Sequence, residues 1–155
     1  MPSSKAGIVM LSLKEAQLIA DGAIQMAEEI GVKVCVTVCD AGGRFVLINR
    51  MDGAPWAAVY GSKGKAIGSA CFNISTGRLK GRTGGNHARV VQFEGQHMVL
   101  DQGGVAIFRD GIGVGACGVD GGTGVQDEAC ARTGITKFTS APTPKPAHVA
   151  GAAHR

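Results

Sequence analysis

The chain has 155 residues, which fits one domain and is long enough to bury a hydrophobic core. With 45% hydrophobic and 18% charged residues, the composition excludes a wholly disordered chain, and the 25 glycines are about twice the ordinary share of roughly 7%. The formal net charge is +4, but only 5% of residues are aromatic and no groove-reading motif occurs, so we expect no nucleic-acid partner. No apolar run approaches the roughly 20 residues of a bilayer-spanning helix, so we expect no membrane partner.

The start of the chain and its cysteines predict a cytoplasmic protein. A short apolar patch at residues 7–11 is followed by no small-residue cleavage pattern and leads directly into helical sequence. The five cysteines form no C-x-x-C pair, and an odd number of scattered thiols fits a reducing compartment.

The first predicted element is a helix that begins after Ser12. The Ser12 hydroxyl can cap the helix while Glu15 reaches back to it, which is the capping-box arrangement. Small and aliphatic side chains recur at helical spacing up to Gly31, a residue that suits the left-handed conformation at a helix end. We therefore expect a helix over 12–31 that packs closely on a sheet.

A β-hairpin is predicted next. In residues 32–39 valines alternate with Lys33, Cys35, Thr37 and Cys39, which predicts a strand with one open or semi-polar face. After a glycine turn, residues 44–50 are apolar on both faces, and this pattern predicts a second, more deeply buried strand.

A second helix is predicted from Pro55 to Cys71, since proline is well tolerated at the first helical position. Residues 73–96 show no clean period and carry most of the basic charge. For this segment we expect a loop with one helical turn.

Another hairpin is predicted around Asp110 and Gly111, because Asp-Gly between two apolar runs is a strong turn signal. The glycines of residues 111–118 superficially resemble a dinucleotide-binding fingerprint. They lie within the second apolar run of this hairpin and no helix follows directly, so we interpret them as sheet glycines.

The last predicted helix repeats the capping box with Thr123 and Gln126. Asp127 and Glu128 suit the positive end of the helix dipole, and Gly134 is expected to end the helix.

The order of elements is helix, hairpin, helix, irregular segment, antiparallel strands and helix. Because parallel crossovers are missing, we predict an α+β fold, with an antiparallel sheet covered by helices. We expect a single domain over 1–138. Residues 139–155 are rich in proline and alanine without a burial pattern, so we expect an extended or mobile tail.

Three segments carry a resemblance to a known family. They are VCVTVCDAGGRFVLINRMDGAPWAA, SKGKAIGSACFNIST and GGVAIFRDGIGVGACGVDGGTGVQDEACARTGI. Together they resemble the haem-degrading-domain family of GlcG, HbpS and the PduO C-terminal domain, over about Ser12 to Ile135. The resemblance implies a profilin-like three-layer α/β/α core with a five-stranded antiparallel sheet, and a homo-oligomer that is a dimer or a larger ring.

The turn before the last helix is a candidate anion site. Gly121 and Gly122 can bring backbone N–H groups to a helix start, where a carboxylate or phosphate is favoured. The alternative is that these glycines serve only the tight turn, with Asp127 and Glu128 answering the helix dipole.

The histidines inside the predicted domain are His87 and His97, without the spacing of a zinc site, so we expect no metal centre. One imidazole with nearby cations such as Arg78 or Arg89 can hold haem, which needs an axial ligand and partners for its propionates. The resemblance adds Thr76, which matches the position where a threonine approaches the haem iron in a haem-binding member. Haem is accordingly the cofactor expected, if there is one.

Three classes of function follow and stay open at this point. The first is a small-ligand protein that binds haem or another anionic tetrapyrrole. The second is an enzyme of small-molecule catabolism, a deaminase, tautomerase or hydrolase, in which Arg78 or Arg89 holds a carboxylated metabolite while His87, His97 or Glu94 transfers a proton. The third is a non-catalytic oligomeric sensor or assembly module.

Overall fold

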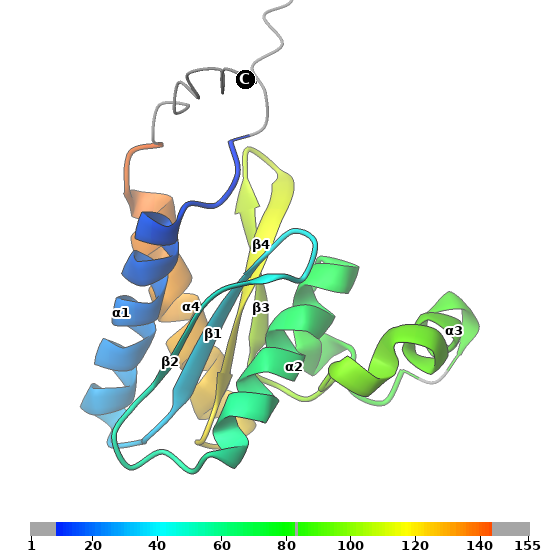
Figure 1. Cartoon of the computed structure of the whole chain (residues 1–155), viewed down its shortest axis with the longest axis horizontal. Coiled ribbons are helices and arrows are strands. Elements are labelled where there is room, and N and C mark those ends of the chain that lie inside the picture. Colours follow the sequence, from blue (N-terminus) through cyan, green and yellow to red (C-terminus); the bar gives the residue numbers. More distant parts are fainter. Residues whose placement is uncertain (1–8, 83, 144–155) are drawn as a thin grey trace, which may run out of the picture.

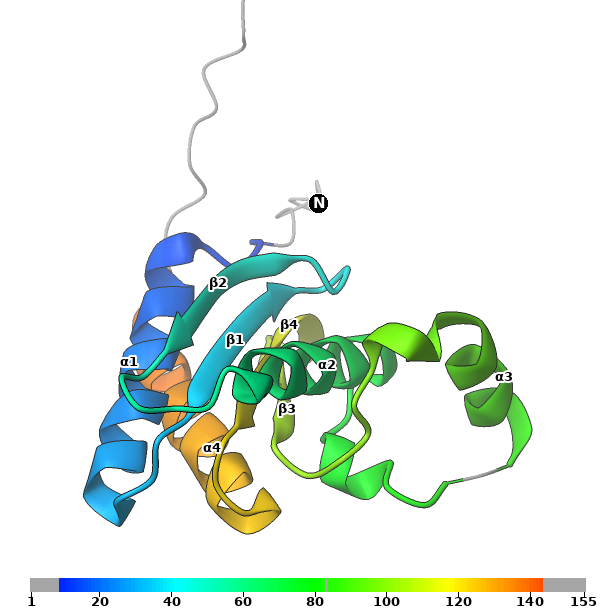
Figure 2. The same ribbon diagram turned by 60° about the horizontal axis from the view of Figure 1, so that its bottom comes forward.

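The computed structural model describes residues 9–82 and 84–143 and places an antiparallel sheet between two layers of helices (Figure 1). The sheet order is β2-β1-β4-β3, and all three pairings are antiparallel. Helices α1 and α4 cover one face and α2 covers the other (Figures 1 and 2). The main elements are α1 (Leu13–Ile30), β1 (Cys35–Asp40), β2 (Phe45–Arg50), α2 (Ala57–Phe72), β3 (Gly104–Arg109), β4 (Ile112–Asp120) and α4 (Gly124–Ser140).

The predicted α+β class is confirmed, but the expected number of strands is wrong. The resemblance implied five strands, whereas the described residues form a sheet of four. None of the described helices is both long and apolar enough to cross a membrane.

Both predicted capping boxes are confirmed. The Ser12 hydroxyl accepts from the Glu15 N–H at 3.1 Å, and the Glu15 carboxylate accepts from the Ser12 N–H at 3.1 Å. Thr123 and Gln126 exchange the equivalent bonds at 3.3 and 2.9 Å. Gly31 ends α1 with φ +74°, in the left-handed conformation that glycine adopts without strain.

The segment predicted as a loop contains a real helix. Residues 73–96 include the one-turn helix η1 (Thr76–Arg78) and the ten-residue helix α3 (Gly85–Glu94), and the one-turn helix η2 (Gly95–His97) follows. Helix α3 projects away from the sheet (Figure 2), and none of its residues is buried. Because α3 covers no core, its sequence lacks the apolar stripe from which a helix is recognised.

The predicted exposures of the first hairpin are both wrong. Helix α2 buries the face of β1 that was expected to be open: the Thr37 and Ser62 hydroxyls lie 2.8 Å apart, and the Cys39 thiol donates to the Ala66 carbonyl. Strand β2, expected to be deeply buried, pairs only with β1 and has no fully buried residue. Its apolar side chains are partly exposed to water, because β2 is an edge strand.

Helix α4 does not end at Gly134 but continues to Ser140, so Thr139 and Ser140 are helical rather than part of a tail. Gly134 is needed instead where α4 crosses α1. A Cβ atom at this position would lie 2.3 Å from the Ile19 carbonyl oxygen. Residues 144–155 of the predicted tail lie outside the described residues.

The main core lies between the sheet and the α1/α4 layer. It is built from small and branched side chains, among them Ile19, Ala23, Val36, Ile107 and Phe138. Alanines at the crossing of α1 with the sheet and α4 allow a close approach, which agrees with the close packing expected from the sequence.

We expect Gly134→Ala to lower the free energy of unfolding by about 2 kcal/mol or more, because the added methyl group would push α4 away from the α1 backbone. Gly84→Ala is the matched control, since Gly84 has φ −120° and open space around it. The control should change stability by no more than about 0.5 kcal/mol. Urea denaturation of both variants measures the difference, and equal stabilities would contradict this account of the helix crossing.

Candidate functional site

A groove runs along the outer side of α2, between that helix, the turn joining β1 to β2, and the segment after α3. Its main hollow has a volume of about 610 Å³. A second hollow of about 250 Å³ shares Gly43, Ile67 and Met98 with the first, so the two are continuous. We call them together the α2 groove. Its other lining residues are Ala41, Gly42, Arg44, Phe45, Tyr60, Lys63, Gly64, Cys71, Glu94, Gln96, His97 and Val99.

The α2 groove combines apolar and positively charged side chains. Phe45, Ile67 and Val99 make apolar walls. Positive charge comes from Arg44 and from Lys63, whose ammonium nitrogen lies 5.3 Å from the ring centroids of both Phe45 and Tyr60. The first of these sets favours a flat apolar ligand, and the second favours one that carries negative charge.

The same groove contains side chains that can ligate a haem iron. They are the imidazole of His97, the thioether of Met98 and the thiol of Cys71. Within residues 9–82 and 84–143, no group of three His, Cys, Asp or Glu side chains converges to hold a metal ion by itself.

Of the residues predicted to act in catalysis, Glu94 and His97 both line the groove. His87 does not: its ring stacks on Phe72, with centroids 4.8 Å apart and planes 18° apart. Arg89 is exposed on α3 and is not part of the groove lining. The structure thus separates the two histidines that the sequence could not distinguish.

Thr76 is fully buried at the start of η1. Its hydroxyl donates to the Asp101 carbonyl and accepts from the Gly104 N–H at 2.9 Å. These two bonds tie the segment before β3 to η1. Arg78, two residues further on, lines a different cavity beside β3. An iron-proximal role for Thr76 stays a prediction, and it would require the hydroxyl to leave its present partners.

The glycine turn at the start of α4 brings a backbone N–H to a carboxylate of the same chain. The Gly122 N–H donates to Asp127 Oδ1 at 2.8 Å. Gly121 has φ +132° and approaches the segment just before β1 so closely that an added Cβ atom would collide with the Lys33 carbonyl oxygen. A ligand role for the two glycines stays a prediction, and Asp127 already supplies the negative charge in this turn.

Beside this turn lies a buried ion-pair cluster that the sequence reasoning missed. Lys65 Nζ donates to Asp120 Oδ1 at 2.7 Å, to Asp127 Oδ2 at 3.0 Å and to the Val119 carbonyl at 3.0 Å. The side chains of Lys65 and Asp127 are 5% and 1% exposed. The available signal was a lysine among the small residues of the sheet-facing side of α2, opposite two acids in a later segment.

Burial raises the pKa of the Asp127 carboxyl above its ordinary value. The Lys65 ammonium and the Gly122 N–H both favour the ionised form and offset part of this shift. Asp127 is therefore stable as a buried carboxylate only while Lys65 accompanies it.

Of the five cysteines, all within the described part of the chain, none forms a disulfide and only Cys71 is exposed. Burial raises the pKa of Cys39 to about 12 and that of Cys130 to about 11, which leaves both thiols protonated and unreactive at neutral pH. Cys71 is thus the one accessible thiol, and it lies in the α2 groove.

The sequence and the fold occur in a known family. Residues 11–136 match the family model described as haem degrading protein HbpS-like, so the chain belongs to the HbpS-like family.

Two relatives illustrate the range of the family. The chain is 31% identical over 134 residues to an uncharacterised 15.0 kDa protein from the dhaT-dhaS intergenic region of Citrobacter freundii, covering 85% of this chain and 94% of the relative. It is 28% identical over 129 residues to the corrinoid adenosyltransferase PduO of Salmonella typhimurium strain LT2. That match covers 82% of this chain but only 38% of PduO.

Solved structures of related proteins have the same fold as this chain. The crystal structure of Klebsiella pneumoniae protein ORFY superposes with a TM-score of 0.79 at 28% identity, covering 89% of this chain and 97% of ORFY. A PduOC structure solved as a haem complex superposes with a TM-score of 0.75 at 27% identity, covering 83% of this chain and 95% of PduOC.

Replacement of Lys65 by methionine tests the buried cluster. We expect Lys65→Met to lower the free energy of unfolding at pH 7 by about 3–5 kcal/mol, because it leaves Asp127 buried without a counter-charge. The pKa of Asp127 in the folded variant would then lie further above the unfolded value. The penalty is present above this folded-state pKa and is relieved as the pH falls through it, so part of the loss should be recovered between pH 7 and pH 5.

Urea denaturation at both pH values measures this recovery. Lys80→Met is the control, since Lys80 pairs with Asp101 on the surface, where the side chains are 69% and 57% exposed. It should cost no more than about 1 kcal/mol at either pH. An equal loss for Lys65→Met at pH 7 and pH 5 would contradict the assigned role of Asp127.

Proposed function

We propose that this protein binds haem, or another anionic tetrapyrrole, in the α2 groove. The observation that carries the proposal is the presence of an imidazole, apolar walls and two cationic side chains in a single hollow of about 610 Å³. A haem has these needs: an axial ligand, apolar surroundings for the macrocycle and cations for its propionates. The solved haem complex of PduOC, a relative with the same fold, supports the assignment.

In this proposal His97 is the axial ligand, because it lines the main hollow while His87 is stacked on Phe72. Arg44 and Lys63 would face the propionates. Phe45 and Ile67 would contact the faces of the ring. Bound haem would supply redox or oxygen chemistry; the chain's own contribution is to ligate, orient and partly shield the ring.

The second candidate function is acid–base catalysis in the same groove. Glu94 and His97 come from the same short stretch and line its two connected hollows. A carboxylate and an imidazole near a cation are a workable set for proton transfer on a carboxylated metabolite. Loss of turnover in Glu94→Gln without loss of haem binding would favour this function over the first.

We also propose that the protein is a cytoplasmic homo-oligomer. Support for association comes from α3, which has no buried residue and carries Phe93 with 79% of its surface exposed. Support for a reducing compartment comes from the five unpaired cysteines. Comparison of the molar mass by light scattering for the wild type and Phe93→Ser tests the role of α3.

A haemin titration tests the proposed function. We expect a saturable Soret band that His97→Ala shifts and weakens by about tenfold or more in affinity, because the axial ligand is lost. His87→Ala is the matched control and should bind haemin like the wild type. A saturable band that neither variant changes would contradict the ligand assignment, and no saturable band would contradict the function.

Alkylation of Cys71 locates the ligand independently. We expect iodoacetamide to modify one thiol per chain, since the other four cysteines are buried, and we expect Cys71→Ser to abolish this reaction. The reaction should be slow at neutral pH, because partial burial and the Glu94 carboxylate raise the pKa of the Cys71 thiol. Bound haemin should slow the modification of Cys71 several-fold, as followed by mass spectrometry. Unchanged labelling of haemin-saturated protein would place the ligand outside the α2 groove.

A further inference from the structure

A second large hollow lies beside β3, the edge strand at the far end of the sheet from β2. The function proposed above does not use it. It is an open hollow of about 630 Å³, bordered by β3, the segment at residues 73–78 and the outer side of α4. It shares no lining residue with the α2 groove. We call it the β3-edge pocket.

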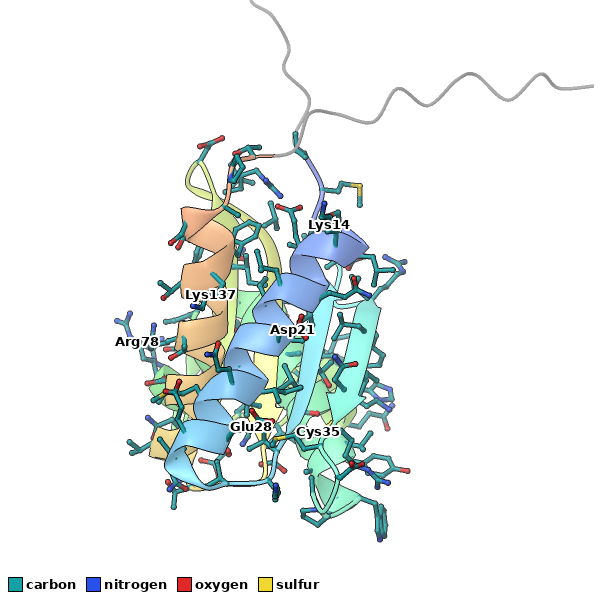
Figure 3. The ribbon with its side chains drawn as sticks, turned by 90° about the vertical axis from the view of Figure 1, so that its left-hand side faces the viewer. Lys14, Asp21, Glu28, Cys35, Arg78 and Lys137 are labelled. Atoms are coloured by element: carbon teal, nitrogen blue, oxygen red, sulfur yellow. The ribbon has the colours of Figure 1, made fainter. Side chains whose placement is uncertain are left out.

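The β3-edge pocket is positively charged. Arg78 from η1 and Arg132 from α4 both line it, on different sides. All the lining residues lie within the part of the chain that the structure describes, and none of them is an aspartate or a glutamate. Arg132 Nε lies 3.5 Å from a Glu128 carboxylate oxygen, and the Arg132 side chain is 55% exposed. Arg78 forms no salt bridge within residues 9–82 and 84–143 and extends past the outer side of α4 (Figure 3).

The floor of the pocket is apolar except for one open stretch of backbone. Ile74, Val105 and Ile135 supply the apolar surface. The Gly103 carbonyl accepts from β4, whereas the Gly104 N–H points outward to Thr76. Since the direction of backbone groups alternates along a strand, the N–H and C=O of Ala106 also point outward, into the pocket.

This open edge is too short for a partner strand. On one side the Thr76 hydroxyl already occupies the outward N–H of Gly104. On the other side the pairing register shifts between Ile107 and Phe108, a bulge of the kind that ends regular edge pairing. Between these points Ala106 alone offers outward backbone groups, so the geometry fits a single small ligand and not a β-strand.

We propose that the β3-edge pocket binds a small carboxylate with an apolar, flat body. Its carboxylate would be held by the guanidinium groups of Arg78 and Arg132 and by the Ala106 N–H, because guanidinium groups and carboxylates match in charge and geometry. Its body would lie on Ile74, Val105 and Ile135. This proposal is independent of haem binding.

Isothermal titration with four probes tests the site: phthalate, benzoate, benzamide and inorganic phosphate. We expect phthalate and benzoate to bind saturably at one site per chain, with benzamide and phosphate at least tenfold weaker. Benzamide lacks the charge, and phosphate lacks the apolar body. Phosphate binding as tight as phthalate would identify a general oxyanion site and overturn the carboxylate assignment.

Matched arginine variants locate the binding. Arg78→Gln and Arg132→Gln should each weaken phthalate by about tenfold or more, the usual effect of losing a charge-assisted hydrogen bond. Arg89→Gln, an exposed arginine on α3 outside the pocket, should leave the affinity unchanged. All three variants should titrate haemin like the wild type. An equal effect of Arg89→Gln, no effect of either pocket variant, or no saturable carboxylate binding would each overturn the proposal.

Discussion

The contact of the Lys65 ammonium with Asp120, Asp127 and the Val119 carbonyl is the constraint on which the arrangement of the layers depends. It joins α2 and α4, which cover opposite faces of the sheet, to the end of β4 between them, and α2 is far from the other two elements in sequence. A buried ion pair is expensive to desolvate, and it is maintained only where further hydrogen bonds satisfy the charges, as the Gly122 N–H does for Asp127. The cluster also fixes the rotation of α2. Because Lys65 faces the sheet, side chains two positions away on either side face outward, where they line the α2 groove.

The parts of the fold that could be predicted from sequence are those determined by neighbouring residues. The capping boxes at Ser12 and Thr123 follow from residues three positions apart, and the Asp110-Gly111 turn follows from a dipeptide. The errors concern packing partners. Gly134 looks like a helix end until the Ile19 carbonyl is placed against it, and β2 looks buried until it is found at the sheet edge. Helix α3 could not be predicted because it packs on no core, so its sequence carries no apolar stripe at helical spacing.

The candidate site was predictable only in pieces, for the same physical reason. Glu94 and His97 were chosen for their chemistry, and the structure brings them to Lys63 and Phe45 from distant segments. Arg78 was chosen with Arg89, yet it shares a pocket with Arg132, an α4 residue that nothing in the local sequence distinguishes. A sequence shows which residue types are available for a site. Which of several similar side chains actually lie in the site depends on how the helices pack on the sheet.

The bond between the Gly122 N–H and Asp127 has a consequence for selectivity at the start of α4. A helix N-terminus behind a glycine turn ordinarily attracts phosphate groups. Here a carboxylate of the same chain is tethered five residues away and occupies the donor at 2.8 Å. A free phosphate must compete with an anion whose effective concentration is fixed by the chain itself, at millimolar or above. The turn therefore carries a built-in anion, which any phosphate group that bound at this end of the fold would have to displace.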